Sequence, residues 1–377
     1  MSVYKRFALI FACFAYIGLP LCFLALCALL WLYDPFMFFH KPYFREQTYH
    51  SDMRIQARGI IDFTDFDSVI LGTSMLKNMS ANKASAKLGN NFINLSAPGL
   101  NFYERATMLD FIFKTKHIKR IIYSIDDFTI ISPDKGVLNA KLYESNVWWQ
   151  KVKYYLNIKF IACALKWSKK SECVGSKREF DRVWNGYDNS AEIYQGFQSC
   201  PISHKNLFLR QYKLEQQKPF KLPFDSVAQK EFVQKYLIDI IVQNSQVEFH
   251  LVLPTNSRNY NRMPFQHGNR QAADVWGIWQ EMIKWLVVEI APYKNAKIYG
   301  FDDLDYANNP SNYNDCYHYN SNMHFMQIDA IANGTHILTP ENIDEYLQTM
   351  ENKIKAYDLA PLIQEIKEWK KSQNDKK

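Results

Sequence analysis

The sequence predicts a three-layer α/β fold, a parallel sheet with helices on both faces, preceded by one transmembrane helix. Short apolar runs at residues 69–71 and 120–125 end at glycine or acidic residues and are typical of buried strands. An amphipathic segment at 103–117 separates two such runs. This alternation indicates a parallel sheet with helical crossovers. A long run without charge, at 7–33, indicates the transmembrane helix.

The remaining elements follow in chain order from the same patterns. We expect strands at 69–71, 91–95, 120–125, 247–253 and 296–299. We expect helices at 83–88, 103–117, 225–244, 271–290 and 320–333, with one or two more at 340–371. Trp276 and Trp279 share a stripe of the 271–290 helix with aliphatic residues, so they are predicted to be core.

These elements predict four parts of the chain. Residues 1–33 are a cytoplasmic stub and signal anchor, and 34–66 are an aromatic and polar connector. Residues 67–347 are the α/β domain, with an insertion at about 128–222 that contains a helical patch near 151–170. Residues 348–377 are a C-terminal helix and a Lys-rich tail.

The composition excludes some classes of protein. A hydrophobic fraction of 47%, with 26 Phe and 23 Tyr, excludes a disordered chain and allows a large core. The net charge of +7 is spread over small clusters such as Lys169 and Lys170. This pattern favours an acidic membrane surface or a polyanionic glycan over nucleic acid, so we expect no nucleic-acid partner.

The amino terminus predicts the topology. Residues 7–33 exceed the roughly 20 residues needed to cross a bilayer. Lys5 and Arg6 precede this run, so the positive-inside rule places Met1 in the cytoplasm and the chain after Asp34 outside. A cleaved signal peptide, the alternative, normally has an apolar region of only about 7–15 residues. We therefore expect an uncleaved anchor in the lipid bilayer.

The cysteines of the exported part are predicted to be structural. They are Cys163, Cys173, Cys200 and Cys316. Cys163 with Cys173, or Cys173 with Cys200, could form a disulfide, because disulfides persist outside the cytoplasm. No C-x-x-C pair is present, so neither a zinc site nor another cofactor is expected.

Ser74 is the first candidate for chemistry. The strand at 69–71 ends before Gly72, and Ser74 follows at its carboxyl end. In open α/β sheets ligands bind just outside these strand ends, where a serine becomes a nucleophile if a base reaches it. The alternative is an ordinary Gly-Thr-Ser turn.

His318 is the candidate base. Asp315 precedes it by three residues, and a helical-type turn would bring the carboxylate to the imidazole. His117 lies among basic residues, and His250 lies inside an apolar strand. His324 is expected to be an exposed helix residue, and its spacing from His318 matches no metal-ligand pattern.

Together these motifs resemble the SGNH (GDSL-type) hydrolase superfamily. The sequence has Gly72-Thr73-Ser74 after the first strand and Asp315-x-x-His318 near the carboxyl end. Stretches 94–99, 120–127 and 252–254 support the resemblance. The chain looks most similar to the membrane-anchored bacterial branch, which includes proteins of cell-envelope glycan O-acetylation and of teichoic acid D-alanylation.

The resemblance implies roles for individual residues. Ser74 would be the nucleophile, His318 the general base and Asp315 the acid that orients it. Backbone N–H groups of Ser74 and Gly99 would form part of the oxyanion hole.

The asparagine of the superfamily's name is missing here. Asp126 and Asp127 stand at the expected strand end, and an ionised carboxylate cannot donate a hydrogen bond. Either Asn101 substitutes, or the oxyanion hole is weaker, or activity is lost.

Two functions are consistent with the resemblance. The first is a serine acyl-ester enzyme, an O-acyltransferase or esterase, acting on a cell-envelope glycan. It would be a single-pass protein of the bacterial cytoplasmic membrane with its domain in the periplasm. A membrane-embedded acyltransferase is an expected partner by analogy. The second is a catalytically silent SGNH-like protein that binds or scaffolds envelope glycan.

Overall fold

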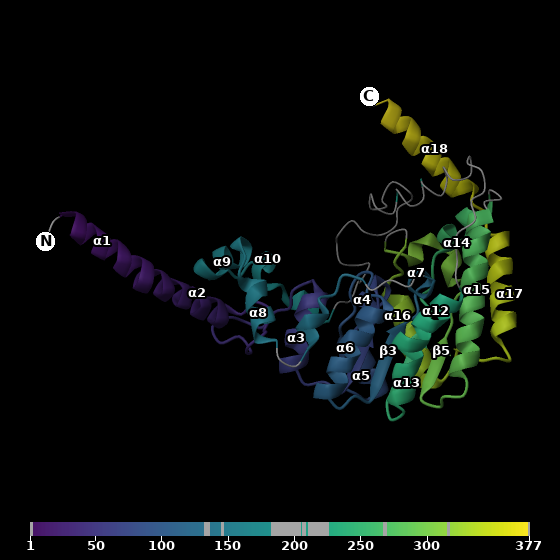
Figure 1. Cartoon of the computed structure of the whole chain (residues 1–377). Coiled ribbons are helices and arrows are strands. Elements are labelled where there is room, and N and C mark those ends of the chain that lie inside the picture. The colour runs from purple at the N-terminus through teal and green to yellow at the C-terminus, as the bar shows by residue number, and fades with distance from the viewer. Residues whose placement is uncertain are drawn as a thin grey trace. The chain divides into compact units, whose positions relative to one another are not determined.

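The chain folds into two compact units. The structure, a computed structural model, describes residues 3–131, 136–144, 147–181, 205, 209, 226–266, 270–314 and 317–375. The N-terminal unit consists of Met1–Asp65 and Leu138–Phe180. The sheet unit consists of Phe66–Val137 and Asp181–Lys377. Figure 1 shows the elements of both units along the chain.

A long apolar helix begins the N-terminal unit. Helix α1 (Val3–Cys13) continues through a π-helical turn into α2 (Leu19–Tyr33). The stretch Ile10–Tyr33 is long and apolar enough to cross a membrane. The structure thus confirms a helix of the predicted length and apolar composition. The side of the membrane on which the rest of the chain lies stays a prediction.

The rest of the N-terminal unit is small and helical. It contains α3 (Met53–Phe63), α8 (Trp148–Tyr155), α9 (Ile158–Leu165) and α10 (Ser171–Val174). A disulfide joins Cys163 of α9 to Cys173 of α10, which selects one of the two predicted pairings. Cys200 lies outside the described residues. Helix α3 was not predicted, because this segment was expected to be part of a connector.

The sheet unit is built on a mostly parallel sheet. Within the described residues six strands pair in the order β2-β1-β3-β4-β5-β6. They are β1 (Ser68–Leu71), β2 (Phe92–Asn94), β3 (Arg120–Ser124), β4 (Glu248–Val252), β5 (Ala296–Tyr299) and β6 (Ile337–Leu338). The first five are parallel and confirm the predicted strands, whereas β6 is antiparallel and was not predicted.

Helices cover both faces of this sheet (Figure 1). Ile122 packs in a core cluster with residues of α5 (Ala81–Leu88) and α16 (Ser321–Asn333). The adjacent Tyr123 points to the opposite face, where Arg105 of α6 (Phe102–Thr115) lies 4.3 Å from its ring. The three-layer arrangement is thus confirmed.

The remaining helices agree with the predicted segments. A helical segment of α12 (Ser226–Val233), a π-helical turn and α13 (Asp239–Gln243) packs on α6. Helix α15 (Arg270–Ile290) contacts α12 and β5, and its Trp279 is buried as predicted. Helices α17 (Ile343–Ala356) and α18 (Ala360–Asn374) end the chain.

The strand order reverses beside β1. The chain passes from β1 to β2 on one side and then to β3 on the other side of β1. In doubly wound sheets, ligands bind where this reversal occurs, outside the carboxyl ends of the strands. The turn after β1 contains Ser74.

Candidate functional site

The turn after β1 holds Ser74 at the start of a short helix, α4 (Ser74–Lys77). Thr73 caps this helix, because its hydroxyl accepts a hydrogen bond from the backbone N–H of Met75 at 3.2 Å. A Cβ atom on Gly72 would lie only 2.5 Å from Oγ of Ser124. The close approach of β1 and β3 therefore requires glycine at this position.

A hairpin brings His318 to Ser74. Tyr313 and Tyr319 form an antiparallel bridge, and the N–H of Asn314 donates to the carbonyl of His318 at 2.8 Å. Next to this bridge, Nε2 of His318 lies 2.9 Å from Oγ of Ser74. Both side chains are partly exposed, so a substrate can reach them. This distance is suitable for proton transfer from the serine to the imidazole.

Asp315 lies outside the described residues, together with Cys316. Its predicted role as the acid that orients His318 therefore stays a prediction. The structure does place the ring of Tyr317 edge-on to the His318 imidazole, at 5.1 Å between ring centroids. This aromatic contact restricts the orientation of the imidazole.

A buried ion pair fixes the serine turn. The carboxylate of Asp126 accepts hydrogen bonds from the hydroxyls of Thr73 at 2.5 Å and Ser124 at 2.6 Å. Arg105 lies 3.5 Å from the same carboxylate and also donates to the carbonyl of Ser124. Asp126 is 1% exposed, and this burial raises its pKa while Arg105 opposes the rise. These contacts join the carboxyl ends of β1 and β3 next to the turn that contains Ser74.

From the sequence, Asp126 was interpreted only as a residue that stands where the superfamily has an asparagine donor. The structure shows instead that its carboxylate is fully used by its neighbours. An arginine on the buried side of the predicted 103–117 helix was the available signal, because a buried arginine requires an acceptor.

The second carboxylate of this strand end lies in a separate cluster. Asp127 accepts hydrogen bonds from the amide of Asn256 at 3.2 Å and from the hydroxyl of Tyr260 at 3.3 Å. Burial raises the pKa of Asp127 to about 6. The Tyr260 ring contacts the ring of Tyr317, which itself packs against His318. Asn256 and Tyr260 were not predicted, although a proline turn after β4 marked their position.

The two predicted oxyanion residues lie on the loop after β2. The N–H of Ala97 in this loop donates to the carbonyl of Gly72 at 3.1 Å, which ties the loop to the serine turn. Gly99 is exposed and has a φ of +63°, a conformation that favours glycine. Asn101 caps α6, since its side-chain oxygen accepts from the N–H of Glu104 at 3.0 Å.

The prediction for His324 is wrong. This residue is 2% exposed and packs against the Tyr319 ring, because α16 turns its side chain toward the hairpin. Burial lowers its pKa to about 3, so its imidazole is neutral. Among the described residues, no group of three or more His, Cys, Asp and Glu side chains could hold a metal ion.

No protein-family model matches this chain, and no curated protein is significantly similar to it. The interpretation of the site therefore depends on its geometry.

Proposed function

We propose that the sheet unit is a serine acyl-ester enzyme of the SGNH type. The observation that carries this proposal is the 2.9 Å distance between Oγ of Ser74 and Nε2 of His318. The pair lies at the carboxyl end of β1, where the strand order reverses and where such sheets bind ligands. A serine and a base within hydrogen-bond distance are the minimal apparatus of nucleophilic acyl transfer.

The reaction would proceed in two steps. Ser74 attacks the acyl carbonyl while His318 takes its proton and then passes it to the leaving alkoxide. The resulting acyl-serine is attacked by a second hydroxyl, which His318 deprotonates in turn; the bond between the acyl group and Oγ of Ser74 then breaks, and His318 returns the proton to Oγ. Backbone N–H groups at Ser74 and Gly99 would stabilise the oxyanion, and Asp315 would orient the imidazole. The second acceptor decides the activity: water makes an esterase, and a sugar hydroxyl makes an O-acyltransferase.

The environment of the reaction is part of the proposal. The apolar helix Ile10–Tyr33 supports membrane anchoring, with the sheet unit on the periplasmic side of a bacterial cytoplasmic membrane. This location favours a cell-envelope glycan as acceptor and a membrane-embedded acyltransferase as donor partner. The proposed chemistry requires no cofactor.

A second function is favoured by one observation. Asp126 occupies the strand end where the superfamily has an asparagine donor, and its carboxylate is fully bonded within the protein. Without that donor, the protein would be a catalytically silent SGNH-like scaffold that binds envelope glycan.

Active-site labelling separates the two functions. The full chain in detergent micelles is treated with a fluorophosphonate probe and with p-nitrophenyl acetate. Ser74→Ala and His318→Gln should each lower turnover by about 10⁴-fold or more, because nucleophile and base act as a unit. Ser311→Ala, at an exposed serine outside the site, should leave turnover unchanged.

The same experiment can also exclude the enzyme. If the folded wild type is neither labelled nor active above Ser74→Ala, the enzyme is excluded and the scaffold remains. Retention of a cell-envelope glycan by both proteins would then support the scaffold.

A further inference from the structure

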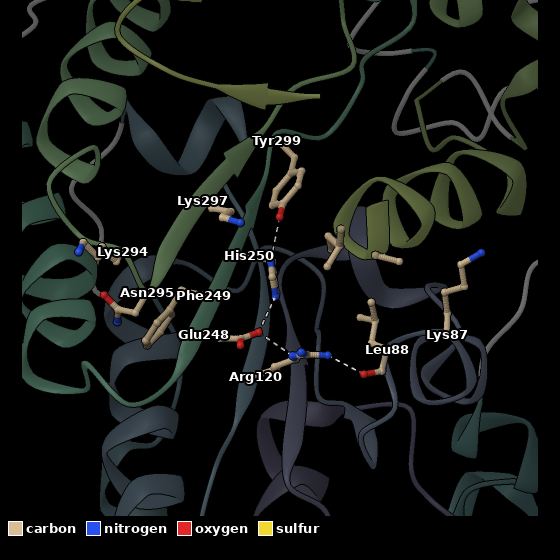
Figure 2. Close-up of a pocket in the computed structure, with 12 residues that line it drawn as sticks. Lys87, Leu88, Arg120, Glu248, Phe249, His250, Lys294, Asn295, Lys297 and Tyr299 are labelled. Carbon is tan, nitrogen blue, oxygen red and sulfur yellow. Dashed lines mark hydrogen bonds and ion pairs between the residues drawn. The ribbon is translucent and has the colours of Figure 1, made fainter. Parts of the chain in front are cut away.

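A cavity lies at the amino ends of β3 and β4, whereas Ser74 follows the carboxyl end of the neighbouring β1 (Figure 2). Its volume is about 460 Å³. The first residues of β3 and β4, Arg120 and Glu248, contribute to its wall together with Lys294, which precedes β5, and Lys297 of β5. The end of α5 and the end of α16 close one side. The cavity therefore belongs to the sheet unit alone.

The charge in this cavity is not balanced. Arg120 is paired with Glu248 at 2.6 Å, and Lys87 is paired with Asp329. Lys294 and Lys297 are exposed, and neither forms an ion pair within the part of the chain that the structure describes. Two lysines that line the cavity without an ion pair among the described residues favour a ligand with two negative charges.

A buried imidazole at the back of the cavity has one ring nitrogen without a hydrogen-bond partner among the described residues. His250 is 8% exposed, and its Nδ1 lies 3.1 Å from the hydroxyl of Tyr299. With the Tyr299 hydroxyl as the donor to Nδ1, the hydrogen of a neutral imidazole is on Nε2. That atom is buried without a hydrogen-bond partner, since Glu248 lies 3.6 Å away.

Glu248 occupies the position that an anion would take. Its carboxylate lies between Arg120 and Nε2 of His250 (Figure 2). About half of the Glu248 side chain is exposed, so it can rotate into solvent at little cost. An anion that replaced it would contact Arg120 and give His250 the missing acceptor.

We propose that this cavity, which we call the basic pocket, binds a phosphate group between Lys294, Lys297 and Arg120, with His250 as a further donor. Lysine and arginine together are typical ligands of phosphate, and the dianion matches the two free lysines. The phosphate could come from a soluble monoester or from a lipid headgroup. The proposal is independent of the reaction at Ser74.

Calorimetric titration of the full chain in neutral detergent micelles tests the proposal. Inorganic phosphate is the probe for a soluble source, and phosphatidic acid in the micelles is the probe for a lipid source. We expect the Lys294→Ala, Lys297→Ala double variant to weaken phosphate binding by roughly tenfold or more. Glu248→Gln should tighten binding instead, because it removes the competing carboxylate.

A matched control has the same change in net charge. Lys367 and Lys371 lie on exposed positions of α18, and replacing both with alanine should leave phosphate binding unchanged. Three results would overturn the proposal: no saturable binding of either probe by the wild type, an equal loss in the two double variants, or weaker binding by Glu248→Gln.

Discussion

The two ends of the sheet hold their charges in opposite ways. At the carboxyl end, Arg105 and Asp126 are almost completely buried, and their hydrogen bonds fix the turn that holds Ser74. At the amino end, Arg120 and Glu248 are 28% and 52% exposed, and Lys294 and Lys297 of the same cavity form no ion pair with any described residue. Buried pairs impose a geometry, whereas exposed pairs can exchange partners. The first arrangement is suited to catalysis and the second to reversible binding.

The largest expected effect comes from breaking the buried pair. Arg105→Met should lower the free energy of unfolding of the sheet unit by about 3–5 kcal/mol, because Asp126 would lose its compensating charge. Hydrogen exchange of the β3 amides in urea measures this change.

The control for this variant lies on the same helix. Lys114 of α6 forms an exposed pair with Asp110, so Lys114→Met should cost at most about 0.5 kcal/mol. Equal losses in Arg105→Met and Lys114→Met would show that the buried pair has no special role.

The pH dependence of the amino end gives the next effect. Burial lowers the pKa of His250 from 6.5 to about 4, so the unfolded chain binds a proton at higher pH than the folded chain. The contribution of His250 to the free energy of unfolding is therefore complete above pH 6.5 and is lost as the pH falls toward 4. The loss is at most about 3 kcal/mol. The free energies of unfolding of His250→Asn and of the wild type should therefore differ less at pH 4 than at pH 6.5. A difference that stays constant over this range would contradict the lowered pKa of His250.

At the carboxyl end of the sheet, Asp127 should give a pH dependence of stability with the opposite sign. Burial raises its pKa from 3.8 to about 6, so the folded chain retains a proton that the unfolded chain has lost. Stability from this group is present at low pH and decreases as the pH rises through 6. Asp127→Asn should thus stabilise the sheet unit by about 1–2 kcal/mol at pH 7.5 and not at pH 4. Asp110→Asn, at an exposed position, should change stability at neither pH.

The smallest effect is expected at the exposed pair. Arg120→Met removes the contact with Glu248 and a hydrogen bond to the carbonyl of Leu88. Since both charged side chains are solvated, we expect a loss of about 1 kcal/mol or less, again from hydrogen exchange of β3. A loss as large as that of Arg105→Met would remove the contrast between the two ends.

Local pattern predicted most of the sheet unit. Apolar runs bounded by turn residues gave β1 and β3, and the heptad-like stripe around Trp279 gave α15. Helix α3 was missed because Gln56 and Arg58 are buried among its apolar residues and obscure the stripe. Strand β6 has two residues, which is too short for any periodicity.

The candidate site was predictable only where one turn defines it. Ser74 was singled out from a strand and a glycine, and the structure places His318 beside it. Their catalytic roles stay predictions. The contact of Arg105 with Asp126, and the burial of His324, arise from packing between separate elements, which no local pattern records.

The interleaving of the two units has a consequence for synthesis on the ribosome. β3 ends at Ser124, but its neighbour β4 begins only at Glu248, after the second segment of the N-terminal unit. At about 5–20 residues per second, β4 emerges many seconds after β3. During this time one edge of β3 has no partner, and unpaired edges template aggregation. We therefore expect that protection of that edge in the nascent chain raises the yield of folded protein.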